Sequence, residues 1–398
     1  MVDLTTTPRL RKLLLLSGIY FDSHTKVVPR RIHQLVTFII VGLCCYTTLF
    51  IIYDIIRNHK FSPQYASYMI VFTWQIQSCI AMLFFIYWQI TGTMKKMGSL
   101  IEHTTKKGRR AVRSMIITCI FMMISCMLLT FGVSFMIRVT GRASTFFDIN
   151  AVNPFFAPEL AAISLVGGTY MLGISIIIIS IFSTQALFVH AELKQLNDSI
   201  SNVGQDFAEP SSEFLIQELR SHLNWHLIIS ERIRTVSGIF EKYGFIMFAI
   251  SIPLSVFTLY TLIVRLSVSW VDAILTIPEV VLGLMKVVFL LYVPSKIQTE
   301  AKRTYSILCS NQKLWLNVDQ HVYEIANIFL MHAGQHDLGI NIWCMTTIIS
   351  KPFILTGSSV VLTTLMFLLQ SHYHCKPSTD PSANALIPAF NITEPIFE

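Results

Sequence analysis

Long apolar runs separated by polar segments dominate the chain. Seven of them are long enough to cross a bilayer as helices. They lie near 33–56, 65–91, 114–137, 160–188, 243–264, 272–293 and 352–370. The last begins at Pro352, which suits the first turn of a helix because its missing N–H would have no partner there. The pattern predicts an all-α membrane protein with seven transmembrane helices.

The polar segments between these runs differ in basic residues, and this difference sets the orientation. The basic set consists of 1–32, 95–113, 189–242 and 294–351. These segments hold 23 Lys and Arg residues, and the segments on the other side hold six. Cytoplasmic segments carry the excess of positive charge, so we expect the N-terminus to be cytoplasmic and the C-terminus extracellular. The acceptor sequence at Asn391 then lies on the outside, where it is a glycosylation site.

Two polar segments carry apolar stripes at helical spacing. The stripe in 212–242 comprises Leu215, Leu219, Leu223, His226, Ile233, Val236 and Phe240. The stripe in 313–333 comprises Trp315, Val318, Val322, Ile325 and Phe329. An apolar stripe needs a partner, so we expect a cytoplasmic helical bundle. The alternative is a pair of amphipathic helices lying on the membrane surface.

Composition narrows the class further. The 398 residues are 53% hydrophobic and 13% charged, with a mean hydropathy of +0.59, whereas soluble domains carry about 25% charge. The net charge of +7 therefore belongs to cytoplasmic loops and indicates no nucleic-acid partner. The eight cysteines form no CxxC pair, and most lie in apolar runs as small packing residues. The leucine run at 13–16 lacks a small-residue cleavage site, so no cleaved signal peptide is expected.

Two ionisable residues inside the sixth run are the sharpest chemical feature. Glu279 and Lys286 are seven residues apart, about 10 Å along one helix face, which is too far for a direct ion pair. Charged groups at this depth face a cavity or a partner. Glu279 follows Pro278 in the outer half of the run. It is a candidate ligand contact, and structural hydrogen bonding or snorkelling to the outer surface are the alternatives. Lys286 lies deeper, where a structural or coupling role fits better.

Aromatic and amide side chains in two other runs extend this candidate site. Trp74, Gln75 and Gln77 lie in the second run, and Tyr170 lies in the fourth. Aromatic walls with a few polar groups suit small organic ligands such as sugars. The same residue types also serve as ordinary packing inside helical bundles, so both interpretations stay open.

No enzyme or metal motif is present in the sequence. His222 and His226 are spaced i, i+4, as are His332 and His336, but the first pair lacks the glutamate of a zinc-protease motif. There is no phosphate-binding loop, nucleophile elbow or dinucleotide fingerprint. We therefore expect no catalytic activity, no cofactor and no metal site.

The last run resembles the C-terminal signature of the insect gustatory receptor family. That signature is Thr-Tyr, five apolar residues, then Gln-Phe. Here it reads Thr363, Thr364, LMFLL, Gln370 and Ser371, so Thr364 and Ser371 replace the aromatic residues. The layout of the whole chain is similar as well, including the reversed orientation and long helices that extend into the cytoplasm. The chain is identified as a divergent member.

The resemblance implies a function and an assembly. Family members are ligand-gated, non-selective cation channels in the plasma membrane, built as homotetramers or heterotetramers with related receptors around one pore. Small-molecule tastants are the expected ligands, and membrane lipid surrounds the spans. The pore would then be lined by Thr363, Met366, Phe367 and Gln370, and an interfacial Gln370 in the headgroups is the alternative. Light- or oxidant-sensing, signalling through a G protein, and secondary transport remain rival functions.

The expected organisation follows from these assignments. Residues 1–32 form a cytoplasmic N-terminus, and 33–293 hold spans one to six with their cytoplasmic extensions. A cytoplasmic anchor helix lies in 294–351, the pore-lining span is 352–370, and 371–398 are an extracellular tail.

Overall fold

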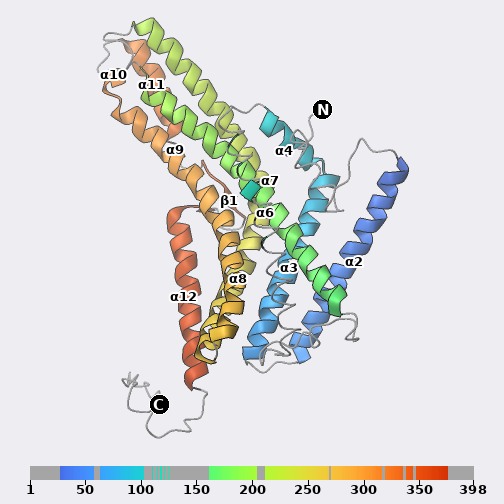
Figure 1. Ribbon diagram of the computed structural model, residues 1–398. Helices are drawn as coiled ribbons and strands as arrows, with labels where there is room; N and C mark the ends of the chain where they lie inside the picture. The colour runs from blue at the N-terminus through green and yellow to red at the C-terminus, as the bar shows by residue number, and fades with distance from the viewer. Residues whose placement is uncertain are drawn as a thin grey trace, which may run out of the picture.

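The computed structural model describes a long helical bundle (Figure 1). The described residues are 27–57, 63–102, 161–203, 211–268, 270–315, 319–334, 338–343 and 347–374, with six single residues between 110 and 125. Most of the expected third span, the N-terminal 26 residues and Asn391 lie outside the described residues. Six described helices are long and apolar enough to cross a membrane: Phe38–Arg57, Tyr65–Ile90, Tyr170–Ser201, Ser212–Ser267, Glu279–Ser310 and Lys351–His372.

The helices are longer than the apolar runs that predict them. Helices α2 (Val27–Arg57), α3 (Pro63–Ile90) and α4 (Thr93–Glu102) come first, followed by α6 (Ala161–Ser201) and α7 (Ser212–Val268). Then come α8 (Trp270–Val287), the π-helical turn η3 (Val288–Tyr292) and α9 (Val293–Ser310), which follow one another without a break. At 57 residues, α7 is about 85 Å long, far more than a bilayer is thick. Its polar part, 212–242, therefore extends beyond the apolar part.

The bundle has two ends of different character (Figure 1). At the turn end, α2 leads into α3 and α7 leads into α8. At the extension end, the polar parts of α6, α7 and α9 lie beside α11 (Gln320–Ala333). Helix α12 (Lys351–His374) runs from the middle of the molecule back to the turn end.

The predicted helix at 313–333 is interrupted. Helix α10 (Gln312–Trp315) precedes the break, and α11 begins after Asp319, which has extended backbone and whose side chain accepts a hydrogen bond from the backbone N–H of His321 at 2.9 Å. Asp is a favoured N-cap residue, which explains the new start. Val318 lies outside the described residues, and the other predicted stripe residues of this segment are buried or half-buried.

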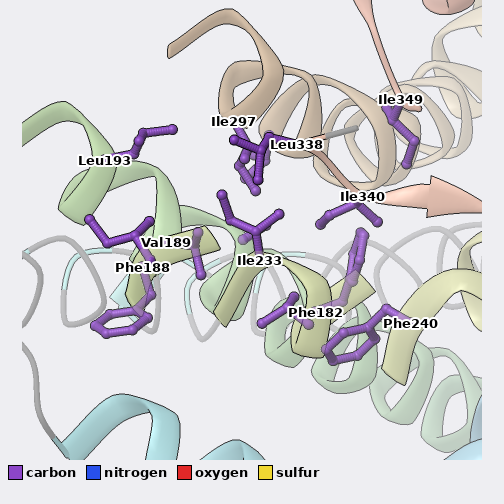
Figure 2. Packing of buried hydrophobic residues seen from close by; sticks show 14 of the residues in the cluster. Phe182, Phe188, Val189, Leu193, Ile233, Phe240, Ile297, Leu338, Ile340 and Ile349 are labelled. Atoms are coloured by element: carbon purple, nitrogen blue, oxygen red, sulfur yellow. The ribbon is translucent and has the colours of Figure 1, made fainter. Parts of the chain in front are cut away.

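The two predicted stripes pack inside this one chain. Leu219 and Phe329 are both fully buried. A short antiparallel hairpin of β1 (Asn341–Ile342) and β2 (Thr347–Ile348) also lies against α7. The backbone N–H of Asn341 donates to Ser237 Oγ at 2.9 Å. Figure 2 shows apolar side chains from α6, α7, α9 and the hairpin region directed toward one another. They include Phe182, Phe188, Val189, Leu193, Ile233, Phe240, Ile297, Leu338, Ile340 and Ile349.

Polar groups connect the helices of the extension end. Glu192 on α6 and Arg232 on α7 form an ion pair, with Arg232 Nη1 at 2.6 and 2.7 Å from the two carboxylate oxygens. Asn197 on α6 is fully buried and donates to the carbonyl and carboxylate oxygens of Glu300 on α9, at 2.9 and 3.0 Å. Thr304 donates back to Asn197 Oδ1 at 2.6 Å. A buried polar group with partners on a second helix fixes the register of the two helices.

Candidate functional site

The inner face of α8 carries both predicted ionisable residues. Its outward face is an apolar stripe, formed by Trp270, Ile274, Ile277, Val281, Leu284 and Val288, all exposed. Glu279 lies about 180° from the centre of this stripe, and only about 20° from Lys286 around the helix axis. Thr276 and Lys286 on this inner face are buried, whereas the side chain of Glu279 is exposed. Glu279 therefore turns away from the outward stripe and still reaches open space.

Lys286 is enclosed by side chains from two other helices. Its Nζ lies 3.8 Å from the ring centroid of Trp74 on α3. It donates to Gln77 Oε1 at 3.3 Å and to Ser175 Oγ on α6 at 3.1 Å. A cation over an indole face is stabilised by about 2 kcal/mol or more when it is desolvated. The ring and the two oxygens compensate for part of the cost of burying an ammonium group.

Gln77 extends this cluster to a fourth helix. The side chain is fully buried, and its Nε2 donates to Ser251 Oγ on α7 at 3.3 Å. Ser251 in turn donates to the carbonyl of Met247 at 2.7 Å. The Lys286 cluster, meaning Trp74, Gln77, Ser175, Ser251 and Lys286, thus joins α3, α6, α7 and α8. A ligand or a movement that displaces one of these helices changes contacts of all four.

The helix geometry changes directly after Lys286. The turn η3 is π-helical, and π-turns inside α-helices occur often at functional sites. The hydroxyl of Ser183 on α6 donates to the carbonyl of Phe289 within this turn at 3.1 Å. The irregular backbone is thereby held against α6, one turn beyond the Lys286 cluster.

A second polar group lies nearer the turn end. Arg265, near the end of α7, donates from Nη1 to Thr276 Oγ1 on α8 at 2.6 Å. Thr276 precedes Glu279 by three residues, so both side chains lie on the same side of α8. The site therefore has two levels along α8, with Glu279 and Arg265 at one and Lys286 at the other.

Helix α12 packs through one face only. Leu365 is buried, and Phe353 packs against Phe248 of α7 with ring centroids 4.9 Å apart. Gly357 allows this close approach, since a Cβ there would lie 3.1 Å from the Phe248 ring. Near the turn end, the Tyr260 hydroxyl and His372 Nδ1 are 3.1 Å apart. The opposite face is bare, and the four predicted pore residues, Thr363, Met366, Phe367 and Gln370, all lie there and are exposed.

Solved structures with the same architecture exist. The chain is similar to the insect olfactory receptor OR5 from Machilis hrabei, with a TM-score of 0.67 and 15% identity, covering 92% of this chain and 97% of that one. The same receptor in complex with eugenol gives a TM-score of 0.66 and 16% identity, covering 92% and 99%. The chain has the fold of the insect olfactory receptors. No protein-family model and no curated protein matches it.

The olfactory receptor fold confirms two predictions made from the sequence. The likeness extends over nearly the whole of both chains. The resemblance to insect chemoreceptors is confirmed at the level of the fold, as is the all-α class. At this identity the similarity does not extend to the roles of individual residues.

Within this fold, the predicted ligand residues separate into two groups. Trp74 and Gln77 meet Lys286 directly. Gln75 is half-buried, and its Oε1 has no hydrogen-bond partner among the described residues. Tyr170 is half-buried and lies five residues from Ser175, about 140° around α6, so it faces a different side of that helix.

The residues that sequence reasoning missed are polar, and all but Arg265 are small. Ser175, Ser251, Arg265 and Thr276 all contribute contacts to the site. Single Ser and Thr residues in apolar runs are a known sign of contacts between membrane helices, but that sign does not tell which helix they meet. The described residues contain no group of three or more His, Cys, Asp or Glu side chains placed to hold a metal ion.

Proposed function

We propose that this protein is a chemoreceptor of the insect gustatory and olfactory kind, a ligand-gated non-selective cation channel of the plasma membrane. The observation that carries the proposal is the bare face of α12. In a chain with the olfactory receptor fold, a helix that packs on one side only presents Thr363, Met366, Phe367 and Gln370 to whatever lies beyond it. Four such faces around one axis would form a pore.

The chemistry of the bare face supports passage of cations. A ring of four neutral Gln370 amides can replace part of the hydration shell of a cation without a fixed charge, which favours weak selectivity. Met366 and Phe367 lie one turn before Gln370, where apolar side chains would close the pore by excluding water. The apolar residues Tyr323, Ile328 and Met331 on α11 are also exposed, and they would add contact area between copies in a homotetramer or heterotetramer.

The inner face of α8 supports ligand binding in the same molecule. Glu279 is exposed on that face, and Trp74, Gln77 and Lys286 form a cluster at the next level. A small molecule that enters near Glu279 would contact α7 and α8 and would reach the four-helix cluster through them. Tastants fit the mixture of aromatic and polar groups, and Gln75 and Tyr170 remain proposed contributors at the edge of the site.

The decisive experiment measures current through the protein alone. The chain is expressed in a cell that lacks related receptors, and a panel of sugars, bitter compounds, amino acids and light is applied during whole-cell recording. We expect at least one stimulus to open a conductance with similar permeability for sodium and potassium. Second-messenger signals without current would favour a receptor that acts through a partner, and substrate uptake without current would favour a transporter.

Gln370 variants connect that current to α12. Gln370→Arg is expected to suppress cation current, because four added charges repel cations, and Gln370→Ala is expected to change the unitary conductance. Gln370→Asn is the matched control, because it keeps the amide. Normal conductance and normal permeability ratios in both test variants, at equal surface expression, would remove Gln370 from the pore.

A further inference from the structure

Two residues of α7 each carry a buried polar atom that has no hydrogen-bond partner among the described residues. Arg265 uses Nη1 to hold Thr276 Oγ1 at 2.6 Å, but its Nε is buried and has no hydrogen-bond partner among the described residues. Thr261 lies one turn earlier on α7, is 3% exposed, and its Oγ1 is likewise without a partner in the part of the chain that the structure describes. Two donors are therefore available within one helical turn.

A carboxylate lies close by on α8. Glu279 follows Thr276 by three residues, so it lies on the same side of α8, about 4.5 Å further along the axis from the residue that anchors Arg265. Its side chain is exposed on the inner face of the helix. No ion pair joins Arg265 and Glu279 among the described residues, although Arg265 is held at Thr276, three residues before Glu279 on the same helix.

Leaving the donors of Arg265 and Thr261 and the carboxylate of Glu279 without partners costs free energy. A buried guanidinium N–H or hydroxyl without an acceptor loses its hydrogen bond to water and gains nothing in return. A carboxylate on the inner face of a membrane helix also requires a cationic partner or water. One small molecule with an anionic and a cationic end would satisfy both sides at once, whereas an uncharged molecule would satisfy neither charge.

We propose that Arg265, Thr261 and Glu279 form a subsite for a small zwitterion of the α-amino-acid class. The ligand's carboxylate accepts from Arg265 Nε and Thr261 Oγ1, and its ammonium group donates to Glu279. Because Thr276, which anchors the guanidinium, precedes Glu279 by only three residues, the subsite suits a small zwitterion rather than a long one. Binding at this subsite does not require a pore; the claim that binding opens a current rests on the proposed function.

The binding test uses the purified full-length protein. Each of the common α-amino acids is added singly, and the melting temperature is followed, since a ligand that binds only the folded state raises it. We expect at least one amino acid to stabilise the protein. Its carboxamide, which lacks the anion, and its decarboxylated amine should bind at least tenfold more weakly. Absence of stabilisation by any α-amino acid, or equal binding of the uncharged-end analogues, would overturn the proposal.

Substitutions assign the binding to these residues. Glu279→Gln and Arg265→Gln keep the side-chain size or most of it and should each weaken binding at least tenfold, and Thr261→Val should weaken it less. Lys194→Gln and Glu231→Gln remove exposed charges elsewhere on α6 and α7 and should bind like the unchanged protein. Size-exclusion elution reports whether each variant is folded. Unchanged affinity in folded Glu279→Gln and Arg265→Gln proteins would contradict the assignment.

Current recordings with the same compounds separate this inference from the proposed function. Binding of an amino acid without any current would leave the subsite intact and would contradict the channel. Currents evoked only by uncharged stimuli, with no amino-acid binding, would support the channel and would overturn the subsite.

Discussion

Lys286 and Glu279 illustrate how neighbouring positions on one helix face acquire different surroundings. Both are ionisable residues on the inner side of α8. Lys286 is enclosed by Trp74, Gln77 and Ser175, whereas Glu279 is exposed. Sequence alone identifies both residues because charged groups in membrane helices are rare. It could not identify their partners, since a serine on another helix carries no mark of the residue it meets.

His226 is a buried side chain that is poorly matched to its site. It is 1% exposed, packs against the Phe329 ring at 5.5 Å, and neither ring nitrogen has a hydrogen-bond partner among the described residues. An unsatisfied buried polar group costs about 1–3 kcal/mol. We therefore expect His226→Leu to raise the free energy of unfolding by about 1 kcal/mol, measured as a higher melting temperature of the purified protein.

His222 provides the matched control for this prediction. It lies one turn earlier on α7, and its Nδ1 lies 2.7 Å from the carbonyl of Glu218, so Nδ1 carries the proton. Nε2 then accepts from the hydroxyl of Ser199 on α6 at 2.7 Å. His222→Leu breaks both bonds and should lower the melting temperature. If His226→Leu were the more destabilising of the two, the poor match at His226 would be refuted.

At the scale of the element, the apolar spacing of the sequence does not reveal the interruption before α11. The apolar spacing of 313–333 is compatible with one continuous helix and also with two helices separated by a break. The break depends on the capping chemistry of Asp319, whose carboxylate accepts from the N–H of His321. Apolar spacing reports which face of a helix is buried, whereas the ends depend on local hydrogen bonds.

The Asp319 cap makes a prediction about pH. The backbone N–H of His321 and the hydroxyl of Ser212 lower the pKa of the Asp319 carboxyl. The folded state therefore binds the proton less readily than the unfolded state. The stabilisation is present above the unfolded pKa of about 3.9 and is lost as the pH falls through the lower, folded value.

Substitution of Asp319 by asparagine tests the direction of this pH dependence. Asn is an equally good N-cap but does not titrate, so Asp319→Asn should match the unchanged protein at pH 7. Melting temperatures measured from pH 7 to pH 3 should show that the unchanged protein loses stability relative to Asp319→Asn only below about pH 4. An identical pH profile for the two proteins would argue against the cap.

Helices α2 and α3 meet at a pair of thiols. Cys45 Sγ and Cys79 Sγ lie 3.8 Å apart. We expect a mild oxidant such as copper phenanthroline to link them as a disulfide. With a protease site inserted between α2 and α3, the linked fragments should stay together on a non-reducing gel. Cys45→Ser and Cys79→Ser should each abolish the link, and Cys44→Ser should preserve it. Free fragments after oxidation of the unchanged pair would contradict the pairing of α2 with α3.

At the scale of the whole molecule, the class and most helices could be predicted from the sequence. Apolar runs of bilayer length locate six of the described helices, because a segment that crosses a membrane must form its backbone hydrogen bonds within itself, as a helix does. The polar part of α7 was predicted from its apolar stripe, whereas the polar part of α6 could not be predicted in this way, since it resembles a loop in composition. The bare face of α12 was not predictable either. Only the packing of Leu365 and Phe353 on α7 shows which side of that helix remains uncovered.

The orientation in the membrane remains a prediction of the basic-residue bias. A tag at the N-terminus should bind antibody only after the cells are permeabilised, and a C-terminal tag should bind on intact cells. Asn391→Gln should remove a glycan, seen as a faster-migrating band. Surface labelling of the N-terminal tag on intact cells would contradict both the orientation and the channel proposal.

Helix α7 has mechanical consequences because it is continuous. It carries Arg265 at one end and meets Asp319 through Ser212 at the other, with Pro253 inside the helix. A proline removes one backbone hydrogen bond and makes the helix easier to bend at that place. The arm from Pro253 to Ser212 is about 60 Å long, so a tilt of about 5° moves its far tip by about 5 Å. A small tilt of this arm, started by a movement near Arg265, would therefore displace the Ser212 end of α7 by about the length of one helical turn.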